Sequence, residues 1–115
     1  MDDYLTNLRR EFDADEGSFL LKLRCFAEWD KEAFARLIQA MEHCATQHEG
    51  RDSVELWIAR GFWFLESTTA SWVGHTDRRP TREEDYYRRG CQRLYDLSYW
   101  LFFGESPYEG PTPPM

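Results

Sequence analysis

Aromatic side chains are concentrated in two stretches of helical spacing, and this feature restricts the fold more than any other. Of the nineteen aromatic residues, twelve fall within residues 53–73 and 82–103. They are Trp57, Phe62, Trp63, Phe64 and Trp72 in the first stretch, and Tyr86, Tyr87, Tyr95, Tyr99, Trp100, Phe102 and Phe103 in the second. In both stretches the aromatics run most of the way round the helix. Such a helix must be covered on several faces. The two helices therefore either form the centre of a small bundle or present a surface to a partner.

Three earlier segments also carry apolar residues at helical spacing, over residues 2–13, 18–27 and 31–48. Ser18 and Asp30 precede the second and third segments and fit as N-caps, because their side-chain oxygens can accept backbone N–H groups of the first turn. Strand signals are nearly absent. We therefore predict an all-α fold, a small helical bundle of three long helices plus one or two short N-terminal helices.

The two aromatic helices have recognisable starts and a clear end. Asp52 with Glu55, and Thr81 with Glu84, have the spacing of capping pairs at the beginning of a helix. Gly104 follows the last aromatic residues and is placed to end the second helix.

The domain organisation follows from the length and from where the prolines lie. A chain of 115 residues fits one domain with its own core. Four of the five prolines follow residue 104. We predict a single bundle domain over residues 1–104 and a proline-rich, extended tail over residues 105–115.

Charge and cysteine usage restrict the class of partner. The net charge of −7 opposes nonspecific binding to nucleic acid or to an anionic membrane surface, and it suits a basic partner. No apolar run approaches the roughly 20 residues that a membrane span needs, and no leader sequence is recognisable at the start. Cys25, Cys44 and Cys91 form no CxxC pair, which fits free thiols in a reducing compartment. We expect a cytoplasmic protein that binds neither nucleic acid nor membranes.

Arginines between residues 77 and 93 resemble a basic patch, but acidic residues are interleaved with them. Helical spacing predicts that several of these charges neutralise one another one turn apart. The predicted pairs are Glu84–Arg88, Asp85–Arg89 and Arg93–Asp96.

The partner-binding surface is predicted from the faces of the two aromatic helices. A turn of about 100° per residue places Leu56 and Trp63 opposite the core face of the first helix. Trp100 and Phe103 lie on the aromatic C-terminal half of the second helix. Because exposed Trp and large apolar residues anchor interfaces, we predict that these four residues bind another protein or a second copy of the chain.

One pair of residues could hold a metal ion. Cys44 and His48 are one helical turn apart, so both could reach the same ion. A structural zinc site takes four ligands, and Cys25, Cys91 or His75 would have to supply the rest through folding. The alternative is that Cys44 is a small core residue and His48 a half-exposed histidine near a helix end.

These patterns favour a non-catalytic interaction protein, because no recognisable catalytic motif occurs and no cofactor is implied. An inhibitor, an antitoxin or a toxin-immunity protein has this profile of small size, negative charge and many aromatics. The first alternative is a ligand-binding or sensor bundle with an aromatic pocket built from Trp57, Trp72 and Tyr87. The second is a metal-binding protein or metalloenzyme that uses Cys44 and His48.

Overall fold

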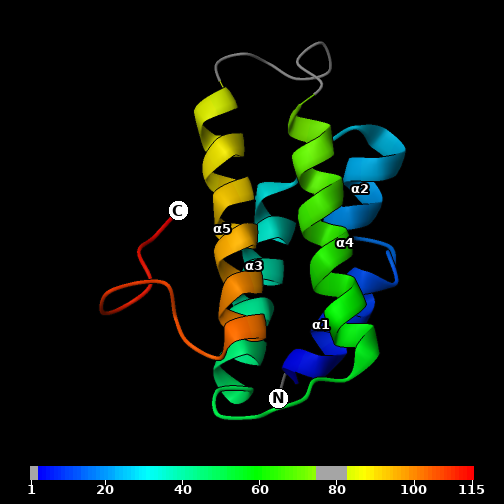
Figure 1. Ribbon diagram of the computed structural model, residues 1–115. Coiled ribbons are helices and arrows are strands. Elements are labelled where there is room, and N and C mark those ends of the chain that lie inside the picture. Colours follow the sequence, from blue (N-terminus) through cyan, green and yellow to red (C-terminus); the bar gives the residue numbers. More distant parts are fainter. Residues whose placement is uncertain (1–2, 75–82) are drawn as a thin grey trace.

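The computed structural model describes residues 3–74 and 83–115, and the part of the chain that it describes is helical without any strand. The five helices are α1 (Tyr4–Phe12), α2 (Phe19–Phe26), α3 (Lys31–Gln47), α4 (Leu56–Val73) and α5 (Glu84–Phe103) (Figure 1). Three long helices and two short N-terminal ones confirm the predicted small bundle. Thr81, the predicted cap of the last helix, lies outside the described residues.

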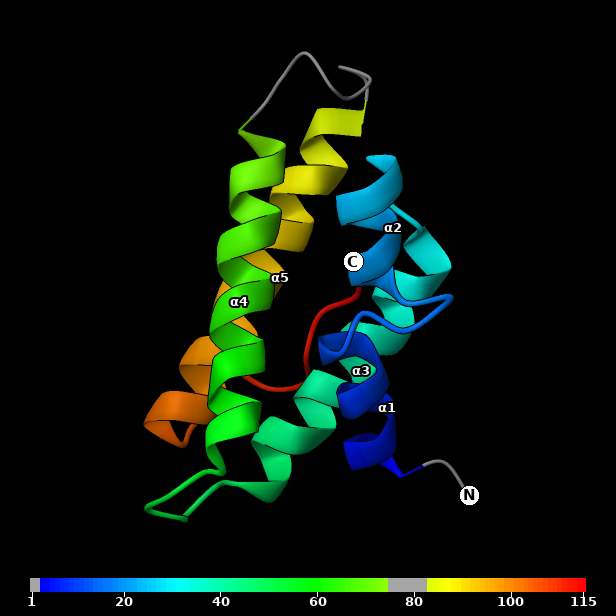
Figure 2. The same cartoon turned by 90° about the vertical axis from the view of Figure 1, so that its right-hand side faces the viewer.

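The two aromatic helices lie side by side, and the other helices cover only part of them. α4 and α5 stand upright beside each other in Figure 1, α5 crosses behind α4 in Figure 2, and the two helices are in direct contact. α3 packs against α5 and α1, while α1 also contacts α4. None of the described helices is both long and apolar enough to cross a bilayer.

Local capping explains where α2 and α3 begin. The Ser18 hydroxyl accepts the Leu21 N–H at 3.1 Å, and the Asp30 carboxylate accepts the Ala33 N–H at 3.1 Å. Each of these bonds satisfies a backbone donor that has no partner inside the helix. Both predicted N-caps are confirmed.

The predicted start of α4 is wrong by about one turn. The helix begins at Leu56, with Glu55 as its N-cap residue, so Asp52 lies before the helix rather than at its cap. The Glu55 side chain makes no capping bond, because its carboxylate accepts the indole N–H of Trp57 at 3.0 Å.

A buried aromatic cluster centred on Trp29 joins the ends of four helices. Trp29 lies in the link between α2 and α3, which the left-handed Ala27 (φ 52°) opens. Its indole is surrounded by rings with centroids 4.8–6.0 Å away, from Phe19, Phe34, Trp72, Tyr86 and Tyr87. Gly90 allows this approach, because a Cβ there would lie 2.6 Å from the Trp29 ring.

The tail after α5, which carries four prolines, folds back along that helix. α5 ends at Phe103, and its C-cap is Gly104, a glycine in the left-handed region at φ 79°. From there the chain loops outward and returns beside α5, so that its last residue lies at mid-height of that helix (Figure 1).

Candidate partner-binding surface

The structure separates the four predicted partner-binding residues into two groups. Leu56, Trp63 and Phe103 are 60%, 65% and 70% exposed. Trp100 is only 7% exposed and belongs to the core, so its predicted exposure is wrong. The reason is that the end of α3 covers this flank of α5, where the Trp100 indole N–H donates to the Glu49 carboxylate at 2.6 Å.

Trp100→Phe tests this assignment. The change removes the indole donor and part of the buried ring, leaving the Glu49 carboxylate without that partner. We expect a loss of about 1–3 kcal/mol in the free energy of unfolding, measured by urea denaturation. A loss below about 0.5 kcal/mol would mean that Trp100 lies at the surface after all.

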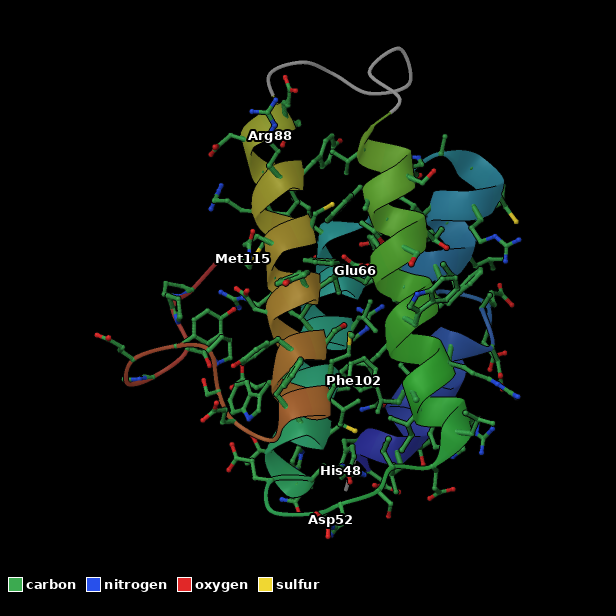
Figure 3. The ribbon with its side chains drawn as sticks, viewed as in Figure 1. His48, Asp52, Glu66, Arg88, Phe102 and Met115 are labelled. Atoms are coloured by element: carbon green, nitrogen blue, oxygen red, sulfur yellow. The ribbon has the colours of Figure 1, made fainter. Side chains whose placement is uncertain are left out.

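The exposed apolar residues of α4 border a groove of about 680 Å³. α1 and α5 contribute to its walls, and Figure 3 shows Phe102 on the side of α5 that faces α4. Its large apolar lining residues are Phe12, Leu56, Trp57, Trp63, Phe64, Leu65 and Phe102. We call this the α4 groove. Phe103 is not part of its lining and lies one residue further along the chain.

A close helix crossing fixes one wall of the α4 groove. A Cβ on Gly61 would lie 2.1 Å from the ring of Phe12, so only glycine lets α1 approach α4 this closely. The Phe12 ring packs edge-on against Trp57 and Phe62, with centroid separations of 6.2 and 6.0 Å. Edge-to-face packing of this kind holds aromatic walls in defined positions.

Arginines are placed against the aromatic rings of this surface. The Arg9 guanidinium lies 3.9 Å from the centre of the Trp57 ring, and that of Arg24 lies 5.4 Å from the Phe64 ring. Arg60 also lines the α4 groove, where Asp13 is the acidic lining residue. The surface is therefore not as acidic as the net charge of −7 suggests. Trp and Arg are the residue types that most often dominate binding energy at interfaces.

The three predicted pocket residues do not come together. Trp57 lines the α4 groove, and it lies fifteen residues before Trp72 on the same helix, a rise of roughly 22 Å. Trp72 and Tyr87 are buried and pack against each other at 5.2 Å in the cluster around Trp29. They are core residues, and only Trp57 faces a cavity.

Cys44 and His48 do lie close together, but inside the core. The Cys44 Sγ is 3.7 Å from His48 Nδ1, and the same nitrogen lies 2.8 Å from the Cys44 carbonyl oxygen. Burial raises the pKa of the Cys44 thiol to about 12, which disfavours the thiolate that metals bind. Among residues 3–74 and 83–115, no three His, Cys, Asp or Glu side chains are grouped so that they could hold an ion. The pair therefore supplies two candidate donors, and His48 is buried rather than half-exposed.

A buried carboxylate is the polar feature that the sequence interpretation missed. Glu11 is buried between α1 and α2, where it accepts the Phe19 N–H at 2.9 Å. Burial raises its pKa to about 7, while the Phe19 N–H and the charge of Arg36 act in the opposite direction. The available signal was its position three residues after Leu8, on the apolar face of α1.

Comparison with known proteins adds no relative. The chain matches no protein-family model, and the searches of curated proteins and of solved structures found no match either.

Proposed function

We propose that this protein binds another polypeptide chain through the α4 groove. The observation that carries the proposal is the exposure of Trp63, which is 65% accessible beside exposed Leu56 and Phe102. A contiguous apolar surface of this kind costs solubility when it stays uncovered, and in soluble proteins it commonly marks an interaction site. Arg9 and Arg60 add donors at its edge that a partner can use.

The mode of action that fits best is occlusion of the partner. The α4 groove is lined mainly by apolar and arginine side chains, and Asp13 is its acidic lining residue, so it does not present a pair of acids for general acid–base chemistry. The Cys44 thiol is buried with a raised pKa, which makes it a poor nucleophile. An inhibitor, an antitoxin or a toxin-immunity protein needs no chemistry of its own, and we place this chain in that class.

Trp63→Ala should weaken the complex while the domain stays folded. The side chain is largely in water, so its loss should change the free energy of unfolding by less than about 0.5 kcal/mol. At the centre of an interface, removal of a tryptophan costs about 2 kcal/mol or more, which is roughly a thirtyfold loss of affinity. Titration of the isolated partner against both forms, followed by calorimetry, measures the loss.

Phe26→Ala is the matched control for that experiment. Phe26 is as exposed as Phe103, but it lies on α2 and does not line the α4 groove. The complex should keep its affinity in this variant. Equal losses in Trp63→Ala and Phe26→Ala would mean that general surface hydrophobicity, rather than the α4 groove, retains the partner.

A small apolar ligand is the second candidate for the same groove. Its volume of about 680 Å³ falls in the usual range for ligand sites, about 300–1,000 Å³, and aromatic rings line it. In that case mass spectrometry of the purified protein should detect a retained small molecule, and adding it back should raise the melting temperature. Trp63→Ala should abolish the rise.

A further inference from the structure

Three side chains of α5 hold the tail in place. Two arginines one turn apart donate to backbone oxygens of the tail, and an aspartate accepts a tyrosine hydroxyl from it. The three contacts are Arg89 to the Met115 backbone oxygen, Arg93 to the Pro113 carbonyl, and the Tyr108 hydroxyl to the Asp96 carboxylate at 2.9 Å. As residue numbers rise along the tail they fall along α5, so the tail runs antiparallel to the helix.

After the left-handed Gly110 (φ 77°) has turned the tail, the spacing of the two arginine contacts matches the repeat of an extended, proline-type chain between Pro113 and Met115. Four residues of an α-helix rise about 6 Å, which separates Arg89 from Arg93 along the axis. Two residues of a polyproline II chain also span about 6 Å, which is the separation expected for the backbone oxygens of Pro113 and Met115 in such a conformation. Arginines at i and i+4 can therefore bind every second carbonyl of such a chain in register. Because polyproline II has no internal hydrogen bonds, its carbonyl oxygens remain available as acceptors.

The tyrosine gives the tail a third point of attachment. The Arg93 guanidinium lies 5.5 Å from the centre of the Tyr108 ring, and the ring is half-buried against the core. Burial, followed by the hydrogen bond to Asp96, raises the pKa of Tyr108 to about 12. The predicted Arg93–Asp96 pair is replaced by these contacts, since Asp96 accepts from Gln92 and Tyr108.

The far end of the tail is also anchored rather than free. Met115 is half-buried against the core, and Figure 3 shows it beside α5, on the side away from α4. The site therefore combines two arginines that bind backbone oxygens, a carboxylate that accepts an aromatic hydroxyl, and an apolar contact for the side chain of Met115. Together these contacts define a ligand class and not only a loop conformation.

We propose that Arg89, Arg93 and Asp96 form a binding site for a proline-containing peptide that turns at a glycine and ends in a short extended stretch, and that residues 108–115 of this chain occupy it as an intramolecular ligand. This site lies apart from the α4 groove and does not depend on the function proposed for that groove. The same segment supplied as a separate peptide competes with the attached one. Attachment gives the chain's own tail an effective concentration of about millimolar, so the separate peptide binds well only when the attached segment is weakened.

The test uses the full chain and a fluorescently labelled synthetic peptide with the sequence of residues 105–115. Tyr108→Ala in the full chain removes one anchor of the attached tail and frees the site. Fluorescence anisotropy should then show at least tenfold tighter peptide binding to this variant than to the unaltered chain. Adding Arg93→Ala to Tyr108→Ala should weaken peptide binding at least fivefold. If Tyr108→Ala lowers the melting temperature strongly, Tyr108→Phe serves instead, because it removes only the hydroxyl.

Arg88→Ala in the Tyr108→Ala background is the matched control. Arg88 lies near the start of α5, away from the tail's last residue (Figure 3), and donates to Glu84 at 2.8 Å. This control should leave peptide binding unchanged. The proposal is overturned if the unaltered chain and Tyr108→Ala bind the peptide alike, if neither binds it at millimolar concentration, or if Arg88→Ala and Arg93→Ala weaken binding equally.

Discussion

Trp29→Ala should reduce the free energy of unfolding by about 3–5 kcal/mol, the usual cost of deleting a buried tryptophan. The change removes the ring around which Phe19, Phe34 and Tyr87 pack, at centroid distances of 4.8–5.0 Å. It also removes the indole N–H that donates to the Tyr86 hydroxyl at 3.3 Å. Since small domains are stable by only about 5–15 kcal/mol, thermal unfolding should reveal the loss directly.

Gly90→Ala, made with and without Trp29, tests the packing of the Trp29 ring against α5 directly. In the unaltered chain, Gly90→Ala places a methyl group 2.6 Å from the Trp29 ring and should cost about 1–3 kcal/mol. In the Trp29→Ala background the ring that clashes is gone and the Phe34 ring, at 3.4 Å, is at ordinary contact distance, so the higher helix propensity of alanine should stabilise the chain by up to about 1 kcal/mol. The sign of the Gly90→Ala effect should therefore reverse between the two backgrounds. If Gly90→Ala has the same effect in both, Trp29 does not pack against Gly90.

Glu11→Gln should stabilise the protein at pH 8 and have little effect at pH 4. Burial raises the pKa of Glu11 to about 7 from an ordinary value of 4.5, so the folded chain retains a proton there that the unfolded chain releases. The contribution of Glu11 to stability therefore falls as the pH rises from 4.5 to about 7 and is constant above that. A pKa difference of this size between the folded and unfolded states corresponds to at most about 3 kcal/mol in the free energy of unfolding. Glutamine is always neutral and keeps an oxygen that can accept the Phe19 N–H.

Urea unfolding of both forms between pH 4 and pH 8 measures this difference. The advantage of the Glu11→Gln variant should grow through the window from pH 4.5 to about 7 and then stop growing. Glu16→Gln removes an exposed acid from the link between α1 and α2 and should change stability by less than about 0.5 kcal/mol throughout. A Glu11→Gln difference that is constant with pH would show that the folded state holds Glu11 ionised.

Helix identity could be predicted from the sequence because periodicity and caps are local properties. The helix predicted over residues 31–48 is observed as α3 over Lys31–Gln47, and Ser18 and Asp30 are the N-caps of α2 and α3 as predicted. The start of α4 was predicted too early, because Glu55 uses its carboxylate on Trp57 instead of capping the helix. Trp29 could not be recognised as the centre of the core, since it lies in a link that has no periodicity.

The candidate surface could be predicted only in part, because burial depends on which elements pack together. The helical wheel places Leu56 and Trp63 opposite the core face of α4, and the structure confirms their exposure. It also places Trp100 outside the core stripe of α5, where the end of α3 and Glu49 cover it. The contribution of Phe102 and the α1 wall at Gly61 depends on tertiary contacts that one sequence does not reveal.

Native mass spectrometry of the untagged protein, gently purified from its source organism, tests most directly whether the α4 groove binds a partner. We predict a mass that exceeds that of one chain by the mass of another polypeptide or of a second copy. In the Trp63→Ala variant this added mass should disappear, while the melting temperature stays unchanged. A bare single chain in the unaltered protein, or a complex that persists in Trp63→Ala, would contradict the proposed role of the α4 groove.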